Sequence, residues 1–152
     1  MQASGSDTPP HTTFFTVVRH PLARLASVYR TFFEGDTYDF LYEDYLFGIL
    51  RKRDTFADFV RNIASIPRPL MDQHFRPQVE LLEWYRRKNI GVKVLKVEEP
   101  EAVHAFLEPY DLEWTVKAVG DYSDYYDKAT EAIARRIYCS DLNAFDYTNA
   151  RF

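Results

Sequence analysis

Two arginines and a serine near the start of the chain have the types and spacing needed to hold an oxyanion. Arg19 follows a short apolar run, and Arg24 and Ser27 lie further along the same segment. An arginine at the carboxyl end of a buried strand lies where open α/β sheets bind ligands, and the next helix would offer its N-terminal amides to an anion. Ser27 would add a hydroxyl. The spacing predicts a phosphate clamp, although solvated or ion-paired arginines and a tolerated helix serine would give the same pattern.

His74 is the candidate for acid–base chemistry, because the unperturbed pKa of histidine lies near neutrality. Its place just before Pro77-Gln78 also suits a histidine that caps a helix or fills a gap in the core. His104 lies among apolar helix residues and is expected to be packed. The four histidines have no spacing suited to a metal site, so no metal is expected.

His20 suggests a rival chemistry. Val17-Val18-Arg19-His20 is similar to the opening of the histidine-phosphatase signature. That signature continues with glycine, whereas Pro21 removes both the flexibility and the amide that a phosphohistidine loop would use. We therefore disfavour the phosphatase hypothesis.

Two apolar runs and several helical patterns must position these residues. Phe14–Val18 and 92–97 are typical of strands. The stripe that begins at Leu22 is expected to pack one helix on the sheet. The sequence predicts an α/β fold, rich in helix, in which helices flank a small parallel sheet. Residues 1–13 are expected to be a flexible leader and 14–152 one domain, with helices over about 21–33, 38–50, 55–63, 77–85, 100–107 and 124–138.

Composition limits the classes of partner. The 152 residues are 46% hydrophobic, and 23 acidic against 19 basic residues give a net charge of −4, which provides no global field for nucleic acid or an anionic membrane. Cys139 is the only cysteine, which excludes an intrachain disulfide and a multi-cysteine zinc site. No apolar run is long enough to span a bilayer. We expect a soluble, cytoplasmic protein with no nucleic-acid partner.

Four segments, in order along the chain, resemble sulfotransferases of the carbohydrate type. The first is an Arg-x-Pro-x-x-Arg-Leu-x-Ser-x-Tyr-Arg motif after an apolar strand, similar to the 3′-phosphate-binding motif of that family. The second is similar to its His-x-x-Pro-Gln segment, the third to its late strand ending in glutamate, and the fourth to its closing Tyr-x-x-Asp-x-x-x-Phe-x-Tyr. They occupy residues 19–30, 72–78, 94–98 and 138–147.

The resemblance implies a function and roles for several residues. It implies a partial P-loop-like sulfotransferase fold and transfer of a sulfuryl group from 3′-phosphoadenosine 5′-phosphosulfate (PAPS) to a hydroxyl, with a carbohydrate as acceptor. It makes Arg19 and Ser27 ligands of the 3′-phosphate and His74 the candidate base. Arg24 matches the motif as well, either as a further ligand of the donor or in a structural ion pair.

The sequence departs from the family at the phosphate loop that holds the 5′-phosphosulfate. That loop carries a lysine upstream of the first strand, but the first lysine here is Lys52 and only 13 residues precede Phe14. Lys93 and Lys96 are expected to share one face of the later strand as solvated residues. We therefore expect the chain alone to be a poor catalyst. Three explanations for the missing loop stay open. A second polypeptide supplies the loop, the chain is a fragment of a longer protein, or the domain is a non-catalytic nucleotide-binding or interaction module.

A stretch of acidic and aromatic residues precedes the last predicted helix. Asp121 to Asp127 contains three tyrosines, which combine a stacking face with a hydroxyl. The stretch is suited to lining a sugar-binding groove or to forming a partly buried helix start.

Overall fold

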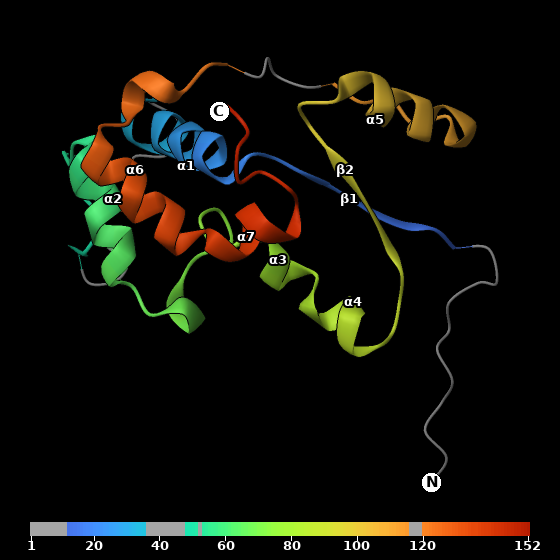
Figure 1. Cartoon of the computed structure of the whole chain (residues 1–152), viewed down its shortest axis with the longest axis horizontal. Coiled ribbons are helices and arrows are strands. Elements are labelled where there is room, and N and C mark those ends of the chain that lie inside the picture. The colour runs from blue at the N-terminus through green and yellow to red at the C-terminus, as the bar shows by residue number, and fades with distance from the viewer. Residues whose placement is uncertain (1–11, 36–47, 52, 116–119) are drawn as a thin grey trace, which may run out of the picture.

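The computed structural model describes residues 12–35, 48–51, 53–115 and 120–152. Most of the predicted leader and most of the predicted helix over 38–50 lie outside these ranges. Among the described residues, no helix is long and apolar enough to cross a membrane. Figure 1 shows helices α1, α2, α6 and α7 gathered on one side of the molecule, with two strands and α5 on the other.

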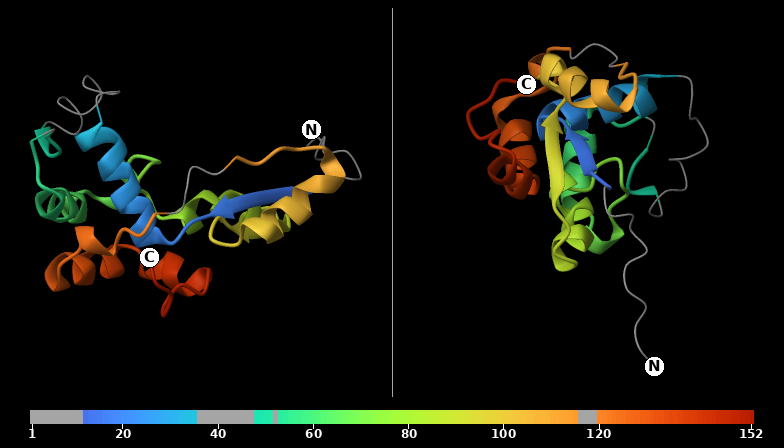
Figure 2. Two further views of the ribbon diagram at one scale, coloured as in Figure 1. Left: turned by 90° about the horizontal axis from the view of Figure 1, so that it is seen from above. Right: turned by 90° about the vertical axis from the view of Figure 1, so that its right-hand side faces the viewer.

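The two predicted strands form the parallel pair that the sequence predicts. Strand β1 (Phe14–Val18) lies beside β2 (Val92–Lys96), with Phe14 opposite Val92 and Val18 opposite Lys96. The Val97 N–H donates to the Val18 carbonyl at 2.9 Å and continues the ladder for one residue. The carboxyl ends of both strands therefore meet at one edge, where Arg19 begins the next turn. Helix α5 (Pro100–Leu107) packs on β2, as Figure 2 shows.

Helix α1 (Pro21–Tyr29) forms as predicted but packs on different neighbours. It continues into a π-helical turn, η1 (Arg30–Glu34), and packs against α2 (Phe56–Ser65) and α6 (Lys128–Ile137). The expectation that its apolar stripe would cover the sheet is wrong, because the helix runs onward beyond the end of β1 (Figure 1). Its stripe instead joins an aromatic core in which the Tyr29 ring meets those of Phe33, Phe56 and Phe59.

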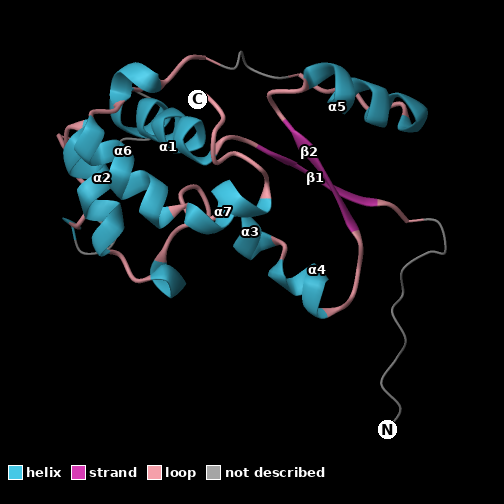
Figure 3. Cartoon of the chain, viewed as in Figure 1, coloured by secondary structure: helices cyan, strands magenta, loops and turns pink. Residues whose placement is uncertain are grey.

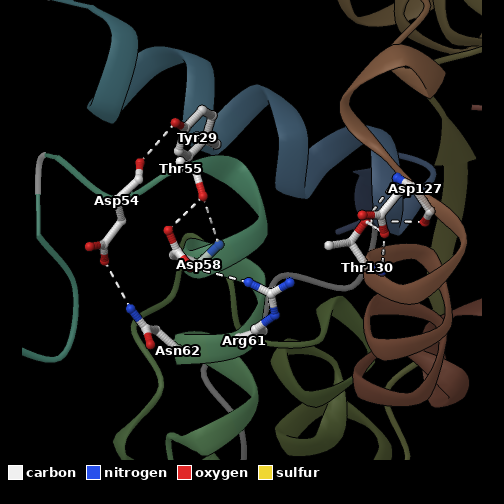
Figure 4. Close-up of polar contacts among 8 residues, drawn as sticks. All are labelled: Tyr29, Asp54, Thr55, Asp58, Arg61, Asn62, Asp127 and Thr130. Atoms are coloured by element: carbon white, nitrogen blue, oxygen red, sulfur yellow. Dashed lines mark hydrogen bonds and ion pairs between the residues drawn. The ribbon is translucent and has the colours of Figure 1, made fainter.

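Local side-chain bonds explain where several helices begin and end. Thr55 Oγ1 accepts the Asp58 N–H at 3.2 Å and starts α2, as predicted. Asp127 and Thr130 form a capping box that starts α6 at Lys128, so the predicted start near Asp124 is too early (Figure 4). The turn η1 ends at Gly35, where the backbone becomes extended, and glycine fits there because an added Cβ would lie 2.6 Å from the Thr31 carbonyl oxygen.

The remaining described elements are short. The helix predicted from residue 77 is divided into α3 (Gln78–Leu81) and α4 (Glu83–Arg87). Figure 3 shows helix as the dominant secondary structure around the single strand pair. The other short helices are η3 (Arg68–Leu70), η4 (Glu108–Tyr110), η5 (Ser123–Tyr125) and α7 (Cys139–Ala144).

Two expectations about surface residues are wrong. His104 is exposed rather than packed. Lys93 and Lys96 do not share a face, because residues three apart in a strand point to opposite faces. Lys93 is exposed, whereas the Lys96 ammonium lies 4.8 Å from the centre of the Tyr147 ring.

Candidate anion-binding site

The turn from β1 to α1 is fixed by side chains from distant segments. The Gln78 amide pairs with both main-chain groups of Arg19: its Oε1 accepts the Arg19 N–H at 3.0 Å and its Nε2 donates to the Arg19 carbonyl at 2.8 Å. Glu98 Oε1 accepts the His20 N–H at 2.7 Å. The His20 ring then caps the helix, its Nδ1 accepting the Leu22 N–H at 3.3 Å.

These bonds correct the predicted chemistry of the helix start. The amides of Arg19, His20 and Leu22 are already bonded within the protein, and Pro21 has no N–H to offer. These three amides therefore cannot bind an anion as the sequence predicts without giving up the bonds that they make here. Any anion held at this edge must be bound mainly by side chains.

Arg19 has a guanidinium group with unsatisfied hydrogen-bonding capacity. Its Nε and Nη2 atoms are buried and have no hydrogen-bond partner within the described ranges. These two atoms lie on one edge of the guanidinium, the kind of edge that binds two oxygens of one oxyanion. The group lies over the Tyr122 ring, with its central carbon 5.0 Å from the ring centre. A buried donor without an acceptor costs free energy, so this edge is suited to an incoming anion.

Ser27 and Tyr122 lie together with Arg19. Tyr122 is only 2% exposed, and its ring also carries the Arg30 guanidinium at 5.6 Å. Burial alone would raise the pKa of the Tyr122 hydroxyl, but hydrogen bonds from Ser27 and Arg19 and the charges of Arg19 and Arg30 lower it below its usual 10. A buried phenol with a lowered pKa marks a local positive field. The structure therefore brings the two predicted ligands, Arg19 and Ser27, to one electropositive point.

Arg24 points to a different part of the molecule. Its Nη1 donates to the Arg76 carbonyl at 2.8 Å and its Nη2 to the Gln73 carbonyl at 2.6 Å. Both acceptors belong to the loop before α3. Burial lowers the pKa of Arg24 from its usual value, while nearby Tyr138 and Asp141 oppose that change. Arg24 fastens this loop to α1, which favours the structural role over contact with a donor.

His74 lies in the loop that Arg24 fastens. Its Nδ1 lies 2.6 Å from Asp72 Oδ1, its N–H donates to the same oxygen, and its ring packs edge-on against Phe32. The side chain is 45% exposed. In the tautomer with the proton on Nδ1, Asp72 orients the ring and leaves the Nε2 lone pair free to accept a proton. These contacts place His74 beside Phe32 and Arg24, and none of them reaches Arg19 or Ser27.

His20 is sealed inside the protein. Its ring is 0% exposed, stacks on Phe152 at 5.0 Å and meets the edge of Tyr147 at the same distance. Burial, partly offset by the Glu98 carboxylate, lowers the pKa of His20 from 6.5 to about 4. A phosphorylated histidine must be reached by a substrate, so this buried cap is unsuited to the phosphatase chemistry.

The four segments that carry the sequence resemblance meet in space. Gln78 from the second bonds Arg19 of the first, and Glu98 from the third joins His20 of the first to the Tyr147 hydroxyl of the fourth, at 2.7 Å on each side. Asp141 of the fourth accepts the N–H groups that start α3, those of Gln78 and Val79, at 2.8 and 2.9 Å. The motif residues thus build a continuous frame around the β1–α1 turn.

One residue of the site was not singled out from the sequence. Tyr122 belongs to the stretch of acidic and aromatic residues interpreted as a sugar groove or a helix start, and its position over Arg19 depends on a contact about a hundred residues away along the chain. Three tyrosines in that stretch gave no sign of which one turns inward. In the part of the chain that the structure describes, no group of histidine, cysteine, aspartate and glutamate side chains could hold a metal ion.

Comparison with known proteins adds no family assignment. No family model, no curated protein and no solved structure matches the chain.

Proposed function

We propose that this chain is a sulfotransferase-like domain that binds the 3′-phosphate of PAPS through Arg19 and Ser27. The observation that carries the proposal is the pair of buried nitrogens on the Arg19 guanidinium that have no partner in the described structure. Ser27 and Arg19 share Tyr122 as a neighbour. A phosphate dianion would supply the acceptors that this edge lacks. The frame built by Gln78 and Glu98 supports the proposal, because it holds Arg19 at the carboxyl end of the sheet.

Chemistry at this site would require a base for the acceptor. PAPS would supply the sulfuryl group to a hydroxyl acceptor, with a carbohydrate as the proposed class. The bond between sulfur and the 5′-phosphate oxygen would break, and adenosine 3′,5′-bisphosphate would leave. His74 is the proposed base: Asp72 orients its ring, and Nε2 would take the proton that the hydroxyl loses as its oxygen bonds to sulfur. Arg24 would act indirectly, by fastening the His74 loop to α1.

The second candidate is a non-catalytic module that binds a nucleotide or a partner protein. It is favoured by the separation of the contacts around Arg19 from those around His74. Within the described residues, the contacts of Arg19, Ser27 and Tyr122 include no lysine that could stabilise a leaving oxygen. Both candidate functions use the same proposed anion site, but only a sulfotransferase would convert PAPS to adenosine 3′,5′-bisphosphate.

Binding is tested by calorimetric titration of the chain with adenosine 3′,5′-bisphosphate and with adenosine 5′-phosphate at low salt. A hydrogen bond to a charged group contributes about 1.5–3 kcal/mol. We therefore expect Arg19→Ala to abolish detectable binding of the bisphosphate and Ser27→Ala to weaken it about tenfold or more. The 5′-phosphate, which lacks the 3′ group, should bind more weakly to the parent chain.

Arg87→Ala is the matched control for charge. Arg87 is exposed and pairs with Glu83 on α4, so its loss removes one positive charge without touching the site. Binding should be unchanged in this variant. If Arg19→Ala binds the bisphosphate as well as the parent does, the proposed function is wrong.

Turnover separates the two candidates. The assay measures release of adenosine 3′,5′-bisphosphate from labelled PAPS with sugar and phenol acceptors, for the parent chain and for His74→Ala. We expect release by this chain to stay near background, because loss of one stabilising donor alone costs about 10²–10³ in rate. Robust release that disappears in His74→Ala would instead establish the catalytic candidate with His74 as base.

A further inference from the structure

A cavity of about 740 Å³ lies between α5 and the chain that follows η4. Asp111 ends η4 with a left-handed backbone, φ 54°, and turns the chain so that residues 112–115 form one wall. The other wall is a helical face made of Glu101, His104, Ala105 and Glu108. Figure 1 shows α5 apart from the helices α1, α2 and α6, so this cavity is separate from the helical core.

The walls of this cavity are acidic. Glu101 and Glu108 lie on the helical wall and Glu113 lies on the opposite one, and all three residues are exposed. None of them takes part in the ion pairs found in the described part of the chain. The described lining includes no lysine or arginine. Three carboxylates without a basic partner create a local negative potential, which attracts a cationic ligand and repels the anions that Arg19 is proposed to bind.

Trp114 gives the cavity an aromatic surface and a hydrogen-bond donor without a partner. Its ring packs against the small core cluster of Leu95, Val103 and Leu107, which joins it to β2 and α5. The indole Nε1 is buried and has no hydrogen-bond partner among the described residues. A tryptophan N–H can only donate, so the atom that completes it must be an acceptor. A ligand that brings such an acceptor would remove the cost of leaving this donor unpaired.

These two features together identify a class of ligand. The carboxylates require positive charge, and the indole requires an acceptor oxygen. A protonated polyamine has the charge but no acceptor, whereas a neutral sugar has acceptors but no charge. A peptide with lysine or arginine side chains has both, because every residue adds a main-chain carbonyl.

We propose that this cavity, here called the acidic groove, binds an extended basic segment of a partner protein. Its basic side chains would pair with Glu101, Glu108 and Glu113, and one of its carbonyls would accept the Trp114 N–H. Glu101 and Glu108 are separated by about 10 Å along the helix, which is the length of about three residues of extended chain. This inference adds a protein partner and does not depend on the proposed nucleotide site.

The fluorescence of Trp114 reports binding at the groove. The chain has two tryptophans, and Trp84 is 57% exposed on α4, outside the groove. Trp84→Phe therefore leaves Trp114 as the only tryptophan. Because Nε1 is buried in the free chain, the indole must shift for a carbonyl to reach it, so its emission should change when a peptide binds.

The probe is a lysine tripeptide with acetylated and amidated ends, titrated into Trp84→Phe at low and at high salt. We expect a saturable change in emission and an affinity that falls with salt, while a glutamate tripeptide with the same ends gives no change. Glu108→Gln and Glu113→Gln should each weaken binding roughly two- to fivefold. Glu83→Gln is the matched control, because it removes a carboxylate on α4, outside the groove, and it should bind as the parent does.

Spermidine tests the role of the carbonyl. It carries the same charge as the lysine tripeptide but has no acceptor, so it should bind roughly two- to tenfold more weakly. Measured by calorimetry, this difference should disappear in Trp114→Phe, which has no N–H at that position. If Trp114→Phe fails to fold, the comparison of the two ligands in the parent decides the point.

Several results would overturn the proposal. One is a lysine tripeptide that does not bind, or that binds equally well to the parent, Glu108→Gln and Glu113→Gln. Equal affinity for spermidine and the tripeptide would show a site for simple polyamines. Salt-independent binding of maltotriose in place of the peptide would show a saccharide site. None of these results affects the Arg19 site, which is tested separately with adenosine 3′,5′-bisphosphate.

Discussion

Arg19 and Arg24 belong to one short motif and have opposite surroundings. Arg24 donates to two main-chain carbonyls of the loop before α3, and both bonds are shorter than 3 Å. Arg19 keeps two buried nitrogens without an acceptor in the described structure and lies over an aromatic ring. Identical side chains on one segment thus have different hydrogen-bonding surroundings.

The difference is the one expected between a residue that binds a ligand and a residue that stabilises the fold. A structural arginine has its hydrogen bonds completed by the protein, so its removal leaves carbonyls without a donor. Arg19, the proposed ligand of an anion, is instead held by its main chain through Gln78, while two nitrogens of its guanidinium have no acceptor in the described structure. Such incompleteness lowers stability in the free protein and is compensated when an anion binds.

The largest effect is expected at Arg24. Arg24→Ala removes two charge-assisted hydrogen bonds, which together contribute about 3–4 kcal/mol at this partly buried position. The free energy of unfolding, measured in urea, should fall by that amount. Arg24→Lys should be intermediate, since one ammonium cannot reproduce both bonds of the guanidinium. An unfolding midpoint unchanged in Arg24→Ala would remove the contrast with Arg19.

The next effect concerns pH and the sealed His20. The pKa of His20 is about 4 in the folded chain and 6.5 in the unfolded chain. Between pH 4 and 6.5, the imidazole therefore binds a proton in the unfolded chain but not in the folded one. Stability from this group is therefore complete above pH 6.5 and is lost as the pH falls to 4, by at most about 3 kcal/mol. Urea titrations at several pH values measure the change.

His20→Asn serves as the reference for that prediction. An asparagine oxygen can still cap α1 but does not titrate. The stability difference between the parent and His20→Asn should shrink as the pH falls from 6.5 to 4. Parallel pH profiles for the two proteins would show that His20 is not the titrating group.

The smallest effect is expected for the stability of Arg19→Ala. The substitution removes a cation–π contact, worth about 0.5–1 kcal/mol, and also removes the buried nitrogens that lack a partner. These two effects oppose each other, so the free energy of unfolding should change by less than about 1 kcal/mol. A loss as large as that of Arg24→Ala would show that Arg19 is a structural residue too.

Local patterns predicted much of the framework. The apolar runs gave both strands and their parallel pairing, and the spacing of Thr55 and Asp58 gave the start of α2. Predicted helix ends were wrong where a local side-chain bond determines the end. The Asp127–Thr130 capping box, for example, starts α6 at Lys128 rather than near Asp124.

The site was harder to predict, because it depends on contacts between distant segments. Periodicity showed that α1 has an apolar stripe but not that α2 and α6, rather than the sheet, would cover it. The amides of its first turn were unavailable because Gln78 and Glu98 reach them from far along the chain. Arg19 and Ser27 were predicted as ligands from their spacing, whereas Tyr122 joins them only through the fold.

The parallel pairing of β1 with β2 has a consequence for the order of folding. The residues it brings together are far apart in the chain: the His20 to Glu98 bond at the end of the pair joins residues 78 positions apart. Closing so long a loop costs entropy before any contact compensates for it, whereas the helices on either side can form from nearby residues. We therefore expect the helical core around α1 and α2 to form early and the strand pair late. Because Arg19 is positioned by the end of that pair, the proposed anion site would be completed in the last step of folding.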